Sequence, residues 1–326
     1  MTPEYSPNIA SATDQLLNEV LTRKWEGFSF RGKENSSPAT QAYKAGLFDH
    51  ALVDNISPFH QSGWLHYGFY VGYTDTKQTA VDFVTSLYPE FGHIYSIEEK
   101  PPRRKRYLWK ITDTKEALTF LTDICPSLYV RRSEGELLKE FLDQRMKRRT
   151  QKISPEERIA NDARFYTALP EIKKQVTTKP YMPTPETLGG MVDGGLGTIA
   201  LDQTTKDSDG YPTPQLILSF DSIHPGLIHG IAGKYDSLKN IHTHTPHLAR
   251  HDEEPSYELR MWGDSAKRFM EDVIGYTRFR TPILLLALEF LNIQEPLRKL
   301  DTVTKRTVRA NYGKALATIK NNLGED

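Results

Sequence analysis

The chain has 326 residues, a formal net charge of zero, 38% hydrophobic residues and 26% charged residues. This composition is typical of a folded globular protein, and the length allows two domains or one pseudo-symmetric double domain. The single cysteine, Cys125, excludes an intramolecular disulfide and a cysteine-based zinc site, and the longest apolar run, residues 283–288, is too short to cross a bilayer, which predicts an intracellular protein with no membrane partner.

A net charge of zero counts modestly against a nucleic-acid binder, because affinity for phosphates usually comes with a basic excess. The basic residues are nevertheless unevenly distributed. They gather at Arg103-Arg104-Lys105-Arg106, at Arg131-Arg132, at Lys147-Arg148-Arg149 and in the C-terminal tail. For nucleic-acid binding, the distribution of basic residues therefore matters more than the net charge of the chain.

Residues 1–36 are polar and form an N-terminal extension, with one short helix predicted around residues 14–23. Residues 37–150 form a first repeat. Alternation of Leu65, Tyr67, Phe69, Val71 and Tyr73 predicts a half-buried strand. Periodicity and turn residues place the elements in the order α-β-β-α-β-β-α-α, with helices at 39–48, 75–87, 113–124 and 133–147 and strands at 51–58, 65–73, 92–98 and 105–111.

Residues 151–179 form a helical linker, because Ser154-Pro155-Glu156-Glu157 is a strong helix start. Residues 180–292 then repeat the element order of the first half, and residues 293–326 form a basic, helical tail. The second repeat has predicted helices at 187–192, 224–231, 264–274 and 281–291 and predicted strands at 198–205, 215–222, 240–246 and 256–262.

Each repeat opens on the same short motif. The first copy is Ala45-Gly46-Leu47-Phe48-Asp49-His50-Ala51, and the second is Leu188-Gly189-Gly190-Met191-Val192-Asp193-Gly194-Gly195. Both predict a short apolar helix with a pair of small residues, ending on an aspartate and leading into a strand. Such a repeat predicts two copies of one supersecondary unit facing each other.

A third paired feature precedes the last helix of each repeat, where residues 126–131 correspond to residues 276–280. On these features the chain resembles the LAGLIDADG homing endonucleases in their single-chain, two-repeat form, over residues 37–149 and 180–292. The resemblance implies an α+β fold with two pseudo-symmetric αββαββα repeats, each with a curved antiparallel sheet, that together form a saddle on double-stranded DNA. The protein would be a monomer with an internal pseudo-dimer, and an organellar, bacterial or phage setting would suit it.

In that family small residues let the two motif helices approach closely, a role that fits Ala45, Gly46, Gly189 and Gly190. Cleavage there requires an acid two places after the motif aspartate, to hold divalent metal. Mg²⁺, the cofactor implied for an active enzyme, prefers such oxygen ligands. Here those positions are Ala51 and Gly195, and neither side chain can bind metal.

Asp49 and Asp193 remain, and for them a hydrogen-bonding role at the helix end is favoured over metal binding. Asp54 and Asp202 lie further along the first strands and are weaker candidates for the groove floor. By the motif match, Arg131 and Arg280 occupy the family's basic position near the scissile phosphates. The metal and catalytic candidates are thus Asp49 and Asp193, with Arg131 and Arg280 beside them.

The candidates for DNA contact lie on the predicted strands and hairpins. Arg103, Arg104, Lys105 and Arg106 are placed to bind phosphates at a hairpin tip, because they join the third and fourth strands. Tyr73, His242 and His244 are further candidates. A zinc site at the histidine cluster 242–251 is disfavoured, because no carboxylate or fourth ligand is placed with His242 and His244, which project from one strand face.

The leading hypothesis is a sequence-specific DNA-binding protein whose cleavage activity is weakened or lost, with no cofactor. One alternative is an active, Mg²⁺-dependent endonuclease that uses Asp49 and Asp193. The other is an intron maturase that binds intron RNA through a different surface. The sequence does not determine the target, because readout is spread over many strand residues and over the shape of the DNA.

Overall fold

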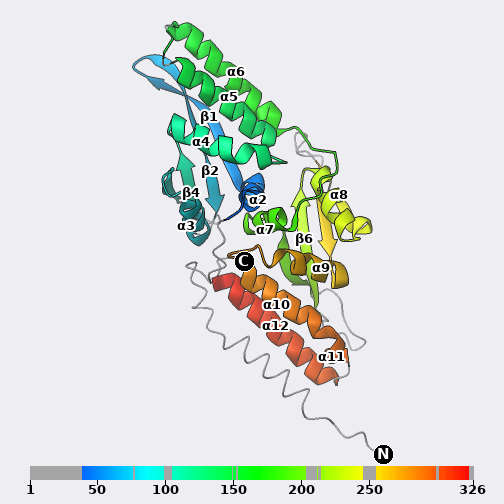
Figure 1. Ribbon diagram of the computed structural model, residues 1–326. Helices are drawn as coiled ribbons and strands as arrows, with labels where there is room; N and C mark the ends of the chain where they lie inside the picture. The colour runs from blue at the N-terminus through cyan, green and yellow to red at the C-terminus, as the bar shows by residue number, and fades with distance from the viewer. Residues whose placement is uncertain are drawn as a thin grey trace, which may run out of the picture.

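A computed structural model describes residues 39–75, 78–98, 105–148, 150–151, 153–202, 211, 214–244, 255–298 and 301–322. The described chain is an α+β protein built from two similar halves (Figure 1). The short helices α2 and α7 lie between the halves. Helices α5 and α6 pack together at one end of the molecule, and α10 and α12 pack together at the other.

Three helices of the first half begin at a residue whose side chain caps them. The side chains of Thr40, Asp113 and Ser154 accept hydrogen bonds from the first free backbone N–H groups of α2, α4 and α6. The elements are α2 (Gln41–Ala51), β1 (Leu52–Gln61), β2 (Trp64–Asp75), α3 (Gln78–Leu87), β3 (His93–Ile97), β4 (Arg106–Ile111), α4 (Thr114–Ile124), a 3₁₀ turn (Cys125–Ser127), α5 (Arg132–Arg148) and α6 (Pro155–Lys173).

The four strands of this half form an antiparallel sheet in the order β1-β2-β4-β3. The hairpin β1–β2 is longer than the pattern predicts, because the chain reverses only at Ser62 and Gly63. Both residues have positive φ, at 53° and 81°, as a two-residue hairpin turn requires. Pro58 lies within β1, where the missing N–H is tolerated because β1 is an edge strand.

The second half repeats this plan. Thr184 caps its motif helix as Thr40 caps the first, and the sheet has the order β5-β6-β8-β7. Its elements are α7 (Pro185–Asp193), β5 (Thr198–Asp202), β6 (Gln215–Ser222), α8 (Pro225–Lys234), a 3₁₀ turn (Leu238–Asn240), β7 (Ile241–His244), β8 (Ser256–Met261), α9 (Gly263–Val273), α10 (Thr281–Asn292), α11 (Gln294–Arg298) and α12 (Thr302–Asn322).

In the part of the chain that the structure describes, each sheet buries one face under helices and leaves the other face uncovered. Trp109, Phe48 and Phe120 pack together in the first core, and Phe220 packs on Phe269 in the second. The C-terminal segment is more than a tail. Helix α12 packs on α10 and buries apolar residues in the second core, namely Val308, Tyr312, Ala315, Leu316 and Ile319.

The two halves meet where α2 crosses α7, and the crossing is close enough to exclude side chains. A Cβ atom at Gly46 would lie 2.0 Å from the carbonyl oxygen of Thr187, and one at Gly190 would lie 2.1 Å from that of Tyr43. Glycine is required at both positions because the backbones themselves are in contact. The same backbone contact fixes how the two sheets are oriented to each other.

The halves also exchange side chains across this junction. Phe279, from the second half, is buried in the first core against Phe83, and Val130, from the first half, packs on the second core.

The fold class and, within the described residues, the predicted order of helices and strands are confirmed. The N-terminal extension lies outside the described residues. None of the helices that the structure describes is both long and apolar enough to cross a membrane.

Candidate nucleic-acid interface and motif junction

The motif aspartates act as helix-end acceptors for the connection that precedes the last helix of each half. Asp49 accepts hydrogen bonds from the backbone N–H groups of Tyr129, at 3.0 Å, and Arg131, at 2.8 Å. Asp193 accepts from Arg278 and Arg280 at 2.6 and 3.1 Å. The two sets of bonds are related by the pseudo-twofold symmetry, so each aspartate ties its motif helix to the same connection.

Both carboxylates are almost completely buried, at 2% and 1% exposure for Asp49 and Asp193. Burial raises the pKa of each to about 6, against the opposing effect of the hydrogen bonds that they accept. Asp193 also accepts a hydrogen bond from the Tyr43 hydroxyl, at 2.7 Å. Their oxygens are therefore occupied by protein donors.

The positions two residues later cannot replace them as metal ligands. Ala51 is the last residue of α2, and Gly195 follows α7 with a φ of 102°, a conformation that favours glycine. Within the described residues no group of three or more His, Cys, Asp or Glu side chains could hold a metal ion. The residues at this junction do not fit the divalent metal that the resemblance implies.

The two predicted arginines lie at the junction but bind protein groups. Arg131 donates through Nη1 to Glu134 at 2.7 Å, and Arg280 donates through Nη1 to the carbonyl oxygen of Gly197 at 3.0 Å. A third arginine, Arg278, lies over the Tyr43 ring with its Cζ atom 5.1 Å from the centroid. Arg131 and Arg280 are thus held by groups of their own halves, whereas Arg278 reaches across the junction to Tyr43 of the first half.

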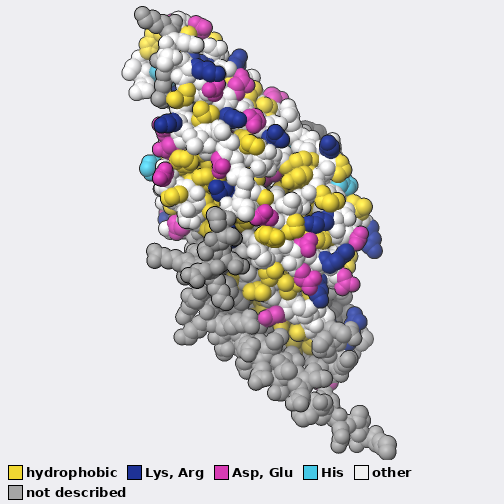
Figure 2. All heavy atoms as spheres, in the orientation of Figure 1, with side chains coloured by type: hydrophobic (Ala, Val, Ile, Leu, Met, Phe, Trp, Pro, Cys, Tyr) yellow, Lys and Arg dark blue, Asp and Glu magenta, His cyan; other side chains and the backbone are white. Residues whose placement is uncertain are grey.

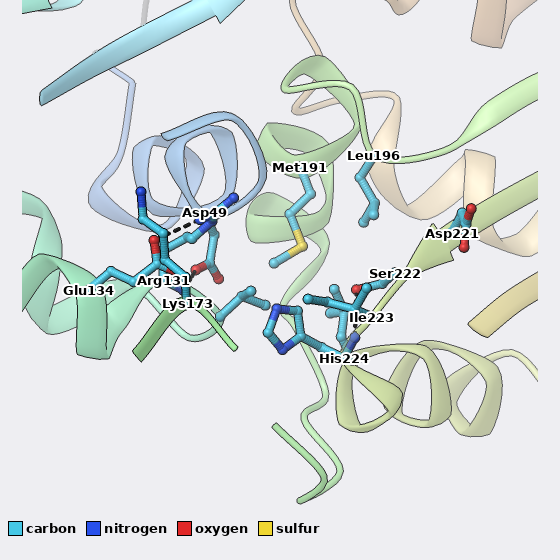
Figure 3. Close-up of a pocket in the computed structure, with 12 residues that line it drawn as sticks. Asp49, Arg131, Glu134, Lys173, Met191, Leu196, Asp221, Ser222, Ile223 and His224 are labelled. Carbon is cyan, nitrogen blue, oxygen red and sulfur yellow. Dashed lines mark hydrogen bonds and ion pairs between the residues drawn. The ribbon is translucent and has the colours of Figure 1, made fainter. Parts of the chain in front are cut away.

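A cavity of about 370 Å³ opens beside Asp49, between the first half and the β6–α8 turn of the second (Figure 3). Its charged lining includes Arg131, Glu134 and Lys173, which the pattern of the sequence does not bring together. The Lys173 ammonium forms an ion pair with the buried carboxylate of Asp54 and donates to the Asp54 carbonyl oxygen at 2.9 Å. Asp54 is therefore turned inward, away from any groove floor.

His224 lines the same cavity at the start of α8. Its Nδ1 accepts a hydrogen bond from the backbone N–H of Thr177 at 3.2 Å, which assigns the neutral ring. Burial, together with the positive charge of Arg131, lowers the pKa of His224 to about 4. The histidine joins the linker to the second half as an uncharged acceptor.

The uncovered face of the first sheet is basic and aromatic. Lys110 lies between the rings of Tyr70 and Tyr95, with Nζ 4.7 and 5.6 Å from the two centroids. Arg106 projects from the same strand on the same face, and Phe59 stacks on His66 further out. No acidic side chain projects from this face among the residues that the structure describes.

The uncovered face of the second sheet carries acids instead. Glu258 lies at its centre and accepts from Ser219 Oγ at 2.7 Å, from Arg260 Nε at 2.8 Å and from Arg260 Nη2 at 2.9 Å. His244 Nε2 lies 2.9 Å from the second oxygen. The hydrogen bonds from Arg260 above all lower the pKa of Glu258 to about 2. The strand register adds Asp202 and Asp221 to the same face.

Across the face of the molecule that Figure 2 shows, Lys and Arg side chains are interspersed with Asp and Glu, which agrees with the zero net charge.

The structure of the DNA-bound homing endonuclease I-GzeII is similar to the chain, with a TM-score of 0.61 over 87% of this chain and 97% of that one, at 12% identity. The chain has the LAGLIDADG endonuclease fold. Structures of I-SmaMI, bound to uncleavable DNA and to cleaved DNA, match with TM-scores of 0.61 and 0.60 at 13% and 12% identity. They cover 85% and 84% of this chain and 97% and 96% of their own.

No protein-family model and no curated protein matches the sequence. The likeness to the LAGLIDADG fold therefore rests on the arrangement of the backbone, since few side chains are shared. The chemistry of this chain therefore depends on its own residues.

Within the LAGLIDADG fold, the predicted contact residues occupy different places. Tyr73 is wrong as a DNA contact, because its ring is fully buried and its hydroxyl donates to Asp75. Lys105 pairs with Glu98 at 2.8 Å, and His242 projects beside Glu258 on the uncovered face. Arg103 and Arg104 lie outside the described residues.

The four small residues predicted to lie at the helix contact differ in what they touch. Gly46 and Gly190 lie at the helix crossing, whereas a Cβ at Gly189 would meet the side chain of Tyr276 at 2.7 Å. Ala45 is buried in the first core. Of these four residues, Gly46 and Gly190 thus lie against the backbone of the partner helix, and Gly194, which follows α7, does so as well, because a Cβ there would lie 2.6 Å from the carbonyl oxygen of Leu47.

Sequence reasoning missed Lys110 and Arg260, which occupy equivalent places in the two sheets. Lys110 pairs with Gly72 in β2, and Arg260 pairs with Ser219 in β6. The available signal was their position one residue before a buried Ile111 or Met261 in the last strand of each repeat. Alternation then assigns both side chains to the uncovered face.

Proposed function

We propose that the protein binds double-stranded DNA sequence-specifically through the two uncovered sheet faces, and that it has lost metal-dependent cleavage. One observation carries the second half of the proposal. Both candidate acids, Asp49 and Asp193, already accept hydrogen bonds from backbone N–H groups, and Ala51 and Gly195 have no side-chain oxygen that could bind a metal. A cleavage centre would need oxygen ligands that face the DNA, and the described residues of the motif junction offer no such group of ligands.

Support for duplex DNA as the partner comes from the geometry of the sheets. A major groove accepts a two-stranded ribbon, and each base pair there shows a distinct pattern of donors and acceptors. The long β1–β2 hairpin offers such a ribbon, with alternate side chains projecting from an uncovered face. The neighbours I-GzeII and I-SmaMI are themselves bound to DNA.

A second candidate partner is intron RNA, and the aromatic side chains of the first sheet favour it. Phe59 and Tyr95 are both 44% exposed. Exposed rings provide stacking surfaces for unpaired bases, which are more common targets in RNA than in duplex DNA. Duplex DNA is preferred because the second sheet has polar side chains and lacks such rings among its described residues.

The test is a selection by the full-length protein from a randomised duplex library, followed by binding of the selected duplex and of a single-stranded RNA library at several salt concentrations. We expect a sequence preference on duplex DNA and an affinity that falls steeply with salt. Incubation of the selected duplex with the protein and Mg²⁺ or Mn²⁺ should leave it intact.

Each part of the proposal can fail separately. Specific cutting of the selected duplex would overturn the loss of cleavage, and Asp49→Asn with Asp193→Asn would then test those residues as the acids used. Binding to RNA without a duplex preference would replace DNA with the second candidate partner. Absence of binding to either would overturn the proposed function.

A further inference from the structure

The two uncovered faces differ in net charge, although each carries a cation at the equivalent position, Lys110 in the first sheet and Arg260 in the second. Among the described residues, the first face has Arg106 and Lys110 with no acid, and the second has Arg260 with three acids. Lys110 lies against the rings of Tyr70 and Tyr95, whereas Arg260 is bound by Glu258. Equivalent positions in a repeated fold have therefore acquired different chemistry.

The second position is a fixed polar network. Glu258 is held by Ser219, by His244 and by two nitrogens of Arg260, and its side chain is only 15% exposed. The Arg260 side chain is 47% exposed. Glu258 binds one edge of the Arg260 guanidinium, formed by Nε and Nη2. The second edge, formed by Nη1 and the other hydrogen of Nη2, can donate to a second acceptor.

That free edge matches one base. Guanine presents two acceptors, O6 and N7, in the major groove, and an arginine binds both of them through a pair of parallel hydrogen bonds. Because Glu258 already fixes the guanidinium, less side-chain entropy would be lost when the base is bound. The arrangement is thus prepared for a guanine edge.

A phosphate is a poor partner for the same arginine. Glu258, Asp202 and Asp221 leave the described part of this face with a net charge of about −2 once Arg260 is counted, which repels a phosphate group. The guanine edge is uncharged, so it meets no such repulsion. An acid beside the arginine therefore favours contact with bases over contact with the backbone.

We propose that Arg260, held in place by Glu258, reads a guanine in the half of the duplex that the second sheet binds. The inference rests on the proposed binding of duplex DNA. It assigns base discrimination at this point to the second sheet, whereas the uncovered face of the first sheet, which carries Lys110 and no acid among the described residues, supplies affinity for phosphates.

The experiment compares duplex selections by the wild type with selections by Arg260→Ala, Arg260→Lys, Glu258→Gln and, as the pseudo-symmetric control, Lys110→Ala. Thermal melting of each variant checks that it folds. We expect Arg260→Ala to lose a preference for guanine of roughly 5- to 150-fold at one position. Arg260→Lys keeps the charge but loses the paired hydrogen bonds, so it should lose most of the same preference.

The two other variants should behave differently. Glu258→Gln should weaken the guanine preference and strengthen binding to unrelated duplexes, because an acid is removed and the arginine is freed. Lys110→Ala should weaken binding to all sequences alike and lower the salt slope by about one.

The inference is overturned if folded Arg260→Ala keeps every guanine preference of the wild type, or if it instead weakens binding to all sequences equally. It is also overturned if Glu258→Gln leaves both the preference and the non-specific affinity unchanged. Lack of any sequence preference in the wild type would be a failure of the proposed function itself, and the wild-type selection shows this separately.

Discussion

The crossing of α2 and α7 can be tested by replacing Gly190 with alanine. The added Cβ would lie 2.1 Å from the carbonyl oxygen of Tyr43, and Cβ contacts below 3.0 Å are essentially never seen. The two helices would therefore have to separate by about 0.9 Å, the difference between 3.0 and 2.1 Å. A gap of that size forfeits roughly a quarter to a half of the dispersion attraction across the contact.

We expect Gly190→Ala to lower the free energy of unfolding by about 3 kcal/mol or more, at the upper end of what overpacking costs. The measurement is urea denaturation followed by tyrosine and tryptophan fluorescence, with circular dichroism as the second probe. Gly233, on the exposed side of α8, is the matched control, because an added Cβ there meets nothing within 4 Å. Gly233→Ala should stabilise the protein by up to about 1 kcal/mol, as expected for alanine in a helix.

The two substitutions thus have opposite predicted signs, although the chemical change is identical. If Gly190→Ala were as stable as the wild type, the backbone contact between α2 and α7 would not be the constraint that the structure shows. A loss of stability in Gly233→Ala of the same size would instead point to a general effect of glycine replacement in helices.

Three further predictions concern groups around the motif junction. Asp49→Asn should cost about 1–3 kcal/mol of stability, because its amide turns a donor towards one of the two backbone N–H groups; equal stability by denaturation would contradict the hydrogen bonds. Lys173→Met should cost about 3 kcal/mol, because it leaves the Asp54 carboxylate buried and unpaired, whereas Lys174→Met, which removes an exposed pair, should change stability by less than about 0.5 kcal/mol. The lowered pKa of His224 means that the unfolded chain binds a proton between about pH 6.5 and pH 4 and the folded chain does not. As the pH is lowered from about 6.5 to about 4, the free energy of unfolding of the wild type should therefore fall relative to that of His224→Asn. Parallel pH profiles of the two proteins in melting curves would refute the buried neutral ring.

Much of the fold could be predicted because its signals are local. Alternation in residues 65–73 predicts β2, and its inward residues Tyr67, Val71 and Tyr73 are buried as that pattern requires. Helix starts such as Ser154-Pro155 also depend only on neighbouring residues. The predicted first strand ends at Pro58, because proline is unusual inside a strand, but β1 continues to Gln61, since an edge strand tolerates proline.

The candidate site was less predictable, because its contacts join residues far apart in the chain. The bond from Arg131 N to Asp49 spans 82 positions, and that from Lys173 to Asp54 spans 119. No pattern within a short window encodes such a partner. For Tyr73, strand alternation predicts a side chain on the buried face, which conflicts with the prediction that Tyr73 contacts DNA.

The sequence by itself determined that the protein consists of two copies of one unit and that both lack the acid two places after the motif aspartate. Ala51 and Gly195 show this loss directly, because a side chain without oxygen cannot hold a metal in any fold. Only the tertiary structure decided what became of the remaining groups. Burial and backbone donors turned Asp49 and Asp193 into structural acceptors, and strand register placed Arg260 beside Glu258 on an uncovered face. These outcomes depend on distances between strands and helices that are set by packing, which no single segment specifies.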